Sequence, residues 1–290
     1  MPPPYGSESA VRRVKLGGLL RGARKLAGLS GVNLAETLSL SQSTLSRIEL
    51  GQAAVSPDLA ASWAAVCRLD PERTAEITAL AELIATDVYP APWHGQVSGG
   101  VARLQQDIAA VEATGRLHLD WHPRLVQGLL QTPDYAREIF RCVYPDGPEL
   151  QAAVAARMAR QSLLFDSGTT LRFLIGEAAL RWPIETTRTL VSQLDRLLLF
   201  LADGTADIGI VPFSTPFGAF SYHAWSVLAE RDEGLPDLVE IGLETANVDI
   251  TDPEQTAAYR DAFERMSDLA HTGDRAVDLI RRIRHELIEG

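Results

Sequence analysis

The sequence has few of the residues that several classes of protein require. It contains only two cysteines, Cys67 and Cys142, which lie far apart and form no CxxC pair. Two such cysteines supply neither a disulfide framework nor a zinc knuckle, and they fit a reducing compartment. The longest apolar run, 197–202, is far shorter than the roughly 20 residues that span a bilayer. We therefore expect a cytoplasmic protein without a membrane partner.

Signature motifs of enzymes and of exported proteins are also missing. The sequence has no GxSxG elbow and no phosphate-binding P-loop. Its first 13 residues, "MPPPYGSESAVRR", are polar and hold no apolar segment, so we expect no secretory signal peptide.

Two groups of residues could carry chemistry. His118 and His122 flank Asp120 at a spacing that places both imidazoles on one face of a helix, where they could hold a metal. However, a proline follows at once and no third ligand is evident. Glu177 lies in the apolar stretch "FLIGEAAL", and a buried carboxylate can be catalytic. We favour a structural role for it, in capping the next turn or pairing with Arg172 or Arg181. The sequence therefore predicts no enzyme, no metal and no cofactor.

Positive charge is scarce overall but concentrated near the N-terminus. The 290 residues, a length typical of about two domains, carry a formal net charge of -11. Residues 11–52 contain seven basic and two acidic residues, so this segment is +5 and the remainder is -16. Phosphate attraction depends on the face presented to a duplex, so a basic segment on an acidic chain can still bind DNA. A merely solvated surface is the alternative.

The apolar pattern of the first 86 residues predicts five short helices. Apolar residues at helical spacing indicate a first helix at 15–27, which Gly28 ends. A short second helix and the turn "SLS" precede a third helix, with Ser41 as its N-cap and Gly51 as its C-terminal stop. Ser56-Pro57 and Asp70-Pro71 open the fourth and fifth helices.

The third helix is amphipathic in a way that suits base recognition. At about 100° per residue, Leu45 and Ile48 share one face with Thr44. The opposite face carries an amide, two hydroxyls and a guanidinium, groups that hydrogen-bond to base edges in the major groove. These four side chains are Gln42, Ser43, Ser46 and Arg47.

The stretch "LAETLSLSQSTLSRIELG" resembles the helix-turn-helix of the phage-repressor (Cro/C1, or Xre) family over residues 15–70. The resemblance implies that Gln42, Ser43, Ser46 and Arg47 face the groove, with Thr44 near the DNA backbone. It also implies a structural ion pair between Arg24 and Glu49. Gly31 departs from the family, which often has a phosphate-bracing glutamine there. We expect Arg12, Arg13 and Lys15 to contact phosphates or the minor groove, and we expect a homodimer on double-stranded DNA.

Residues 87–100, "DVYPAPWHGQVSGG", lack periodicity and predict a linker between a DNA-binding domain at 11–86 and a second domain at 101–290. Beyond it we expect helices at 101–117, 133–143, 149–165, 185–202, 253–270 and 273–288. Between them "TLRFLIGEAAL", "ADIGIVPF", "HAWSVLAE" and "DLVEIGLE" indicate short buried strands. The predicted fold is therefore mainly α, with a five-helix N-terminal domain and a C-terminal α+β domain that has a small sheet.

The second region also resembles a known family. "WHPRLVQGLLQTPDYAREIF", "AARMARQSLLF", "FLIGEAALRWP" and "IGIVPFSTPFGAF" are similar to DUF5753, which follows an Xre domain in antitoxin-like regulators of filamentous high-GC bacteria. The resemblance extends over about residues 105–287. It implies regulation by a protein partner, because relatives are often encoded beside a small protein. It supplies no biochemical activity.

Five of the 19 aromatic residues fall within thirteen positions, at Phe213, Phe217, Phe220, Tyr222 and Trp225. Exposed aromatics suit a ligand pocket or a protein-binding patch, whereas buried ones would pack the sheet against helices. We favour the patch. The sequence thus predicts a DNA-binding transcriptional regulator whose C-terminal domain senses a small protein or ligand. The alternative is an antitoxin-like module that sequesters a small partner and binds DNA only for autoregulation.

Overall fold

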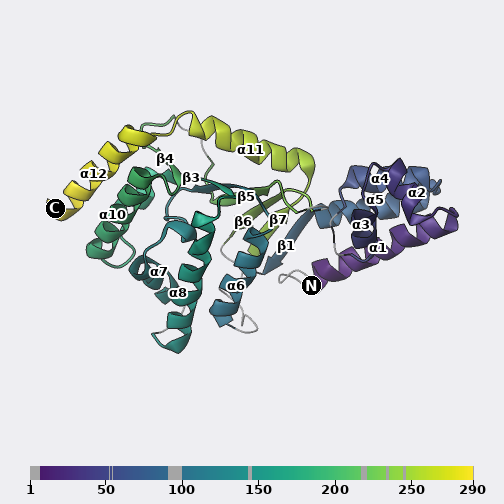
Figure 1. The fold of residues 1–290 in the computed structure, drawn as a ribbon, viewed down its shortest axis with the longest axis horizontal. Helices are drawn as coiled ribbons and strands as arrows, with labels where there is room; N and C mark the ends of the chain where they lie inside the picture. Colours follow the sequence, from purple (N-terminus) through teal and green to yellow (C-terminus); the bar gives the residue numbers. More distant parts are fainter. Residues whose placement is uncertain are drawn as a thin grey trace. The chain divides into compact units, whose positions relative to one another are not determined.

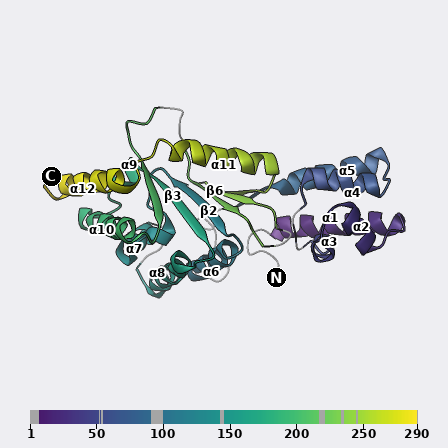
Figure 2. The same cartoon turned by 45° about the horizontal axis from the view of Figure 1, so that its top comes forward.

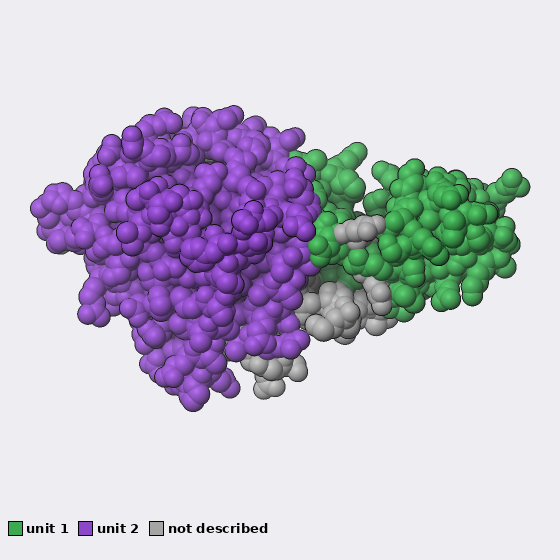
Figure 3. All heavy atoms as spheres, in the orientation of Figure 1, with its two compact units in different colours: residues 1–90, 231–257 green, residues 91–230, 258–290 purple. Residues whose placement is uncertain are grey.

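The computed structural model divides the chain into two compact units. Unit 1 comprises residues 1–90 and 231–257, and unit 2 comprises residues 91–230 and 258–290 (Figure 3). The residues that the structure describes are 7–51, 53, 55–90, 100–142, 146–216, 221–232, 235–243 and 246–289. Unit 1 is therefore not a continuous N-terminal segment, because it includes a stretch from late in the sequence.

Five helices form the N-terminal part of unit 1, as predicted. They are α1 (Ser7–Leu26), α2 (Gly31–Thr37), α3 (Gln42–Glu49), α4 (Pro57–Val66) and α5 (Pro71–Ala85). Their apolar faces meet in one core, in which Leu20, Leu34, Leu45 and Trp63 are fully or almost fully buried. The indole of Trp63 donates to the backbone carbonyl of Leu20 at 3.1 Å, so its one polar atom is satisfied inside the core.

Short-range signals set the ends of these helices. The side chains of Ser41, Ser56 and Asp70 each accept a hydrogen bond from a backbone N–H in the first turn of the helix that follows. Gly28 and Gly51 adopt φ of 70° and 69°, the left-handed conformation that stops a helix. All five predicted boundary residues are confirmed.

Three strands complete unit 1, and two of them were not predicted. They are β1 (Thr86–Pro90), β6 (Leu238–Gly242) and β7 (Ala246–Ile250), in the order β1-β7-β6 with antiparallel pairing. Residues 87–90, which the sequence assigned to the linker, therefore belong to a strand; residues 91–99 lie outside the described part. Its partner strand, β7, is distant in the sequence, so no local pattern predicts this pairing.

Four strands of unit 2 lie in the order β5-β2-β3-β4. Their bounds are β2 (Leu117–His122), β3 (Thr170–Gly176), β4 (Asp207–Val211) and β5 (Trp225–Ala229). β2, β3 and β4 are parallel, while β5 runs antiparallel to β2. The sequence correctly placed β3, β4 and β5 but missed β2, because it considered His118 and His122 at helical spacing.

Helices cover both faces of these four strands. Figure 2 shows α6 (Gly100–Glu112) and α8 (Pro148–Arg160) on one side of β2 and β3, with α11 (Pro253–Ser267) on the other. Figure 1 shows α10 (Thr187–Asp203) beside α12 (Gly273–Glu289). The remaining helices of unit 2 are α7 (Pro133–Arg141) and the five-residue α9 (Glu177–Arg181). The expectation of a mainly helical chain with a C-terminal α+β region is confirmed.

Gly51 offers a test of how closely the third helix approaches the first. A Cβ on Gly51 would lie 2.6 Å from the backbone nitrogen of Val14, whereas a Cβ on Gly28 would meet nothing within 4 Å. Both residues have positive φ, so alanine costs about 1–2 kcal/mol at either position. We expect Gly51→Ala to lose about 1–3 kcal/mol more through the backbone clash.

Urea denaturation followed by far-UV circular dichroism measures the difference, with Gly28→Ala as the matched control. Equal losses of unfolding free energy in the two variants would contradict the close approach of α1 and α3.

Candidate functional site

A network of three hydroxyl groups fixes the start of α3. Ser41 Oγ accepts a hydrogen bond from the backbone N–H of Thr44 at 3.1 Å. The same oxygen lies 2.8 Å from Ser43 Oγ and 2.8 Å from Thr44 Oγ1. The cap satisfies a backbone donor that has no partner inside the helix, so α3 begins at Gln42 without fraying.

The outer face of α3 presents the side chains that the sequence selected. Gln42, Ser43 and Ser46 are exposed, and Arg47 is partly exposed. Leu45 and Ile48 are each only 2 % exposed and anchor the opposite face in the core of unit 1. α3 therefore offers hydrogen-bonding groups to solvent from a helix whose other side is immobilised by packing.

A bidentate ion pair joins α3 to α1. Arg24 donates from Nε to Glu49 Oε1 at 2.5 Å and from Nη2 to Glu49 Oε2 at 2.8 Å. Its third donor, Nη1, reaches the carbonyl of Leu29 at 3.0 Å. The hydrogen bond to Glu49 raises the pKa of Arg24, and both side chains are largely buried. The ion pair implied by the family resemblance is therefore present, and it is a structural brace.

Two residues of the expected DNA-contacting set are placed differently. Thr44 is 8 % exposed and its hydroxyl faces Ser41, so it serves the helix cap. Arg13 is partly buried, and its burial lowers its pKa while the charges of Asp87 and Asp249 raise it. Its charge thus interacts with the carboxylates of Asp87 in β1 and Asp249 in β7. A helical projection does not show this burial, because it does not include the neighbouring elements that cover a side chain.

Three further basic residues of α1 are exposed or partly exposed. Lys15 is exposed, and Arg12 is partly exposed. Arg21, also exposed, lies with its Nε 3.7 Å from Glu49 Oε2, at the edge of the brace. Positive charge therefore flanks the exposed face of α3 within unit 1.

Unit 2 has a pocket where its three parallel strands end. The pocket has a volume of about 530 Å³ and is lined by residues that follow or end β2, β3 and β4, among them Pro123, Arg124, Gly176, Val211 and Pro212. In open α/β sheets ligands bind at the carboxyl ends of the strands. Thr215 Oγ1 is buried in its wall without a hydrogen-bond partner among the described residues, which leaves a polar group for a ligand.

Two of the five clustered aromatic residues line this pocket, and a third is buried. Phe213 and Tyr222 line it and are 66 % and 64 % exposed. Trp225 is only 1 % exposed and packs edge-on against the rings of Tyr259 and Phe263 in α11, at 5.2 Å and 6.3 Å between centroids. Trp225 is therefore part of the core, as the alternative held, because the aromatic side chains of α11 pack over it. The other two aromatics, Phe217 and Phe220, lie outside the described residues.

Glu177 takes the structural role that we favoured. It begins α9, where its Oε1 accepts from Arg181 Nε at 2.7 Å and its Oε2 accepts from the backbone N–H of Phe213 at 2.9 Å. Both carboxylate oxygens are thus engaged. Glu177 ties the loop after β4, which bears Phe213, to the start of α9, and so it shapes the pocket wall.

The two histidines considered as metal ligands lie on a strand and not on a helix. His118, Asp120 and His122 alternate along β2 and share one face of the sheet, so they are not on a helix. Burial lowers the pKa of His118, and burial together with Arg157 and Arg160 lowers the pKa of His122 to about 4. Neither imidazole is therefore charged at neutral pH. Within the described residues no group of three potential ligands could hold a metal ion.

Asp120, the carboxylate between the two histidines, is buried and has a raised pKa. It accepts from Ser226 Oγ at 2.5 Å and from Gln127 Nε2 at 3.4 Å. Burial nevertheless raises its pKa to about 6, because the protein interior disfavours the charged form.

Comparison with known proteins gives two matches to family models. A helix-turn-helix domain matches residues 15–77, and DUF5753, a domain of unknown function, matches residues 105–282. No curated protein matches the chain, and neither does any solved structure. Among the described helices, none is both long and apolar enough to cross a membrane. The helix-turn-helix match, taken with the exposed polar face of α3, indicates DNA binding.

The raised pKa of Asp120 predicts a pH-dependent contribution to stability. Its folded pKa of about 6 exceeds the ordinary value of 3.8, so its proton favours the folded state below pH 4 and this contribution is lost as pH rises through 6. Asp120→Asn cannot ionise. We expect the variant to gain stability relative to the wild type between pH 4 and pH 7, by up to about 3 kcal/mol.

Urea denaturation of both proteins at several pH values measures this gain. Asp261→Asn, which alters an exposed carboxylate on α11, is the matched control and should run parallel to the wild type. A constant difference between Asp120→Asn and the wild type would contradict the assignment.

Proposed function

The chain belongs to the DUF5753 family, whose domain follows a helix-turn-helix domain here, and we propose that the protein is a sequence-specific transcriptional regulator. The observation that carries the proposal is the solvent-facing row of Gln42, Ser43, Ser46 and Arg47 on a helix that is capped, packed and braced. A glutamine recognises adenine and an arginine recognises guanine through paired hydrogen bonds. Rigid support makes such recognition specific, since the readers need not be ordered on binding.

The electrostatics of α1 supports the same function. Arg12 and Lys15 lie on the helix that packs beside α3, where they supply phosphate contacts that hold the reading helix in register. Regulators of this kind bind as homodimers to half-sites about one duplex turn apart. We therefore propose that the protein binds a two-fold symmetric operator as a dimer in the cytoplasm.

We also propose that the DUF5753 domain connects DNA binding to a signal. The pocket at the ends of β2, β3 and β4 exposes two aromatic side chains, Phe213 and Tyr222, beside apolar walls. Exposed aromatics in such a setting bind either a small molecule or an apolar segment of a protein. A small protein encoded by a neighbouring gene is the partner we favour, and an antitoxin-like role, in which sequestering this partner is the main activity, is the alternative.

Substitutions in α3 and α1 should have different effects on DNA binding. Arg47→Ala should relax the preference at a single base position, because it removes one base-edge interaction worth about 1–3 kcal/mol. Arg12→Ala should weaken binding to all sequences alike. It should also reduce the slope of log K against log salt by about 0.9, because one fewer phosphate is neutralised by the protein.

Gel-shift titrations at several salt concentrations, with DNA from upstream of the gene and with single-base variants of it, measure both effects. If the wild-type protein shows no salt-dependent binding to this DNA or to operators selected from random sequence, the proposal fails. An unchanged base preference in Arg47→Ala would remove Arg47 from the readers.

A second experiment tests the pocket aromatics. Tyr222→Ala should abolish co-purification of the small protein encoded next to the gene, because it removes an exposed apolar anchor. Phe165→Ala is the matched control, since Phe165 is also exposed, at 74 %, but does not line this pocket. If both variants retain the partner, or if the wild type never co-purifies with it, the partner-binding role is wrong. Co-purification of the partner with the wild type, without any effect of the partner on transcription, would favour the antitoxin-like alternative.

A further inference from the structure

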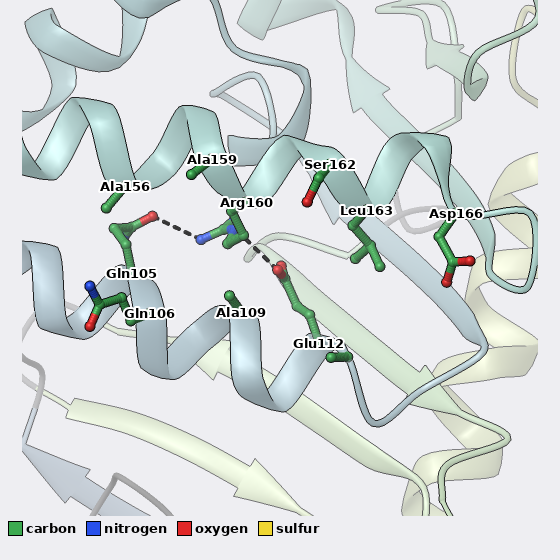
Figure 4. A pocket seen from close by; sticks show the side chains of 11 residues that line it. Gln105, Gln106, Ala109, Glu112, Ala156, Ala159, Arg160, Ser162, Leu163 and Asp166 are labelled. Carbon is green, nitrogen blue, oxygen red and sulfur yellow. Dashed lines mark hydrogen bonds and ion pairs between the residues drawn. The ribbon is translucent and has the colours of Figure 1, made fainter.

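Unit 2 contains two hollows, and their charged groups differ in how they are compensated. One is a cavity of about 380 Å³ between α6 and α8. Its Arg160 Nε lies 3.0 Å from Glu112 Oε2, and Arg160 Nη1 donates to Gln105 Oε1 at 2.9 Å (Figure 4). Arg160, the arginine that lines this cavity, is thus compensated by a carboxylate of the opposite helix.

The pocket at the carboxyl ends of β2, β3 and β4 differs in this respect. Its charged lining residues, within the described part of the chain, are Arg124 and Glu177. Both oxygens of Glu177 are engaged, by Arg181 Nε at 2.7 Å and by the backbone N–H of Phe213 at 2.9 Å. Arg181 also pairs with Glu286, a half-exposed carboxylate outside the lining. Arg124 is exposed and forms no ion pair with any described residue, so it is the lining charge without a partner of opposite sign.

The remaining lining favours a flat apolar molecule. The rings of Phe213 and Tyr222 are exposed at the border, and the indole of Trp121 also lines the pocket. Trp121 Nε1 donates to the carbonyl of Ser221 at 2.9 Å, so its ring offers apolar surface only. Aliphatic surface comes from Pro123, Val211 and Pro212. The volume of about 530 Å³ lies within the range of about 300–1,000 Å³ that holds small organic ligands.

An aromatic acid matches the charge and the walls of this pocket together. Its ring covers apolar side chains that otherwise face water, and its carboxylate meets the guanidinium of Arg124. An aromatic cation would stack on the same rings, but it would lie beside Arg124 while the carboxylate of Glu177 is already engaged. An inorganic anion would leave the apolar walls uncovered.

We propose that this pocket binds a small aromatic carboxylic acid, whose carboxylate pairs with Arg124 and whose ring lies against Phe213 and Tyr222. Thr215 Oγ1, which is buried without a hydrogen-bond partner among the described residues, offers one further polar contact. The inference rests on the proposed role of the pocket in receiving a signal, and it names the chemical class of a ligand that carries it. The acid covers the two rings assigned to the partner protein, so the two ligands exclude each other.

Isothermal titration of the full chain with 2-naphthoate and indole-3-acetate tests the proposal. The neutral probes are 2-naphthamide and indole-3-acetamide, tryptamine is the cationic probe, and acetate supplies the charge without a ring. We expect saturable binding of at least one acid, with its amide about three- to fivefold weaker, as an ion pair at an exposed arginine allows. Acetate should show no saturable binding. Equal binding of acid and amide, tighter binding of tryptamine, or no binding of either acid would overturn the proposal.

A pair of arginine variants places the site. Arg124→Gln should reduce the affinity for the acid to that for its amide, because it removes the charge and keeps a polar side chain. Arg188→Gln alters an exposed arginine of α10 outside the pocket lining, and this matched control should keep the preference of the wild type for the acid. Phe213→Ala should weaken acid and amide alike, and circular dichroism confirms that the variants fold. An unchanged preference for the acid in folded Arg124→Gln would show that the acid binds elsewhere.

These titrations involve neither DNA nor the partner protein, so this inference and the proposed function fail separately. Binding of the acid that depends on Arg124 supports the inference even if the small protein never co-purifies. Co-purification of the small protein together with no binding of either acid would overturn the inference and leave the proposed function intact.

Discussion

The ion pair between Arg24 and Glu49 is the interaction on which the proposed DNA-reading surface depends. It joins α1 to the last residue of α3, and its two parallel hydrogen bonds fix the rotation of α3 as well as its position. The pair is largely buried, so neither partner can be removed without leaving an uncompensated charge inside the fold. Packing of Leu45 and Ile48 then determines which side chains remain outside. The polar face of α3 is exposed because packing of the opposite face and the ion pair hold the helix in this orientation.

Acidic residues are not confined to unit 2. Residues 231–257 carry eight acidic residues and a single basic one, and they belong to unit 1, together with the helix-turn-helix. One of them, Asp249, acts on Arg13 from β7, as does Asp87 from β1. Acidic residues from the second half of the sequence therefore also affect the pKa of a basic residue in α1. The net charge of a segment therefore describes the charge around α1 poorly, because segments distant in the sequence contribute to it.

Unit 2 contains two separate hollows of different chemistry. The pocket at the ends of the parallel strands is bordered by Phe213 and Tyr222 and is shaped by Glu177, whose oxygens are both engaged. The cavity between α6 and α8 is bordered by the buried ion pair of Arg160 with Glu112. The first therefore has exposed aromatic rings at its border, whereas the second has buried charges.

The sequence by itself determined the helices of unit 1, because capping residues such as Ser41 and stop residues such as Gly51 act within a few positions of the chain. It also identified the exposed polar face of α3, since helical periodicity separates Gln42 from Leu45. Only the tertiary structure decided what depends on distant partners. The pairing of β1 with β7, the burial of Trp225 in the sheet and the strand geometry of His118 and His122 each require elements that come together from separate parts of the sequence. Local patterns record which conformation a segment prefers, whereas burial and charge compensation arise only when remote segments pack together.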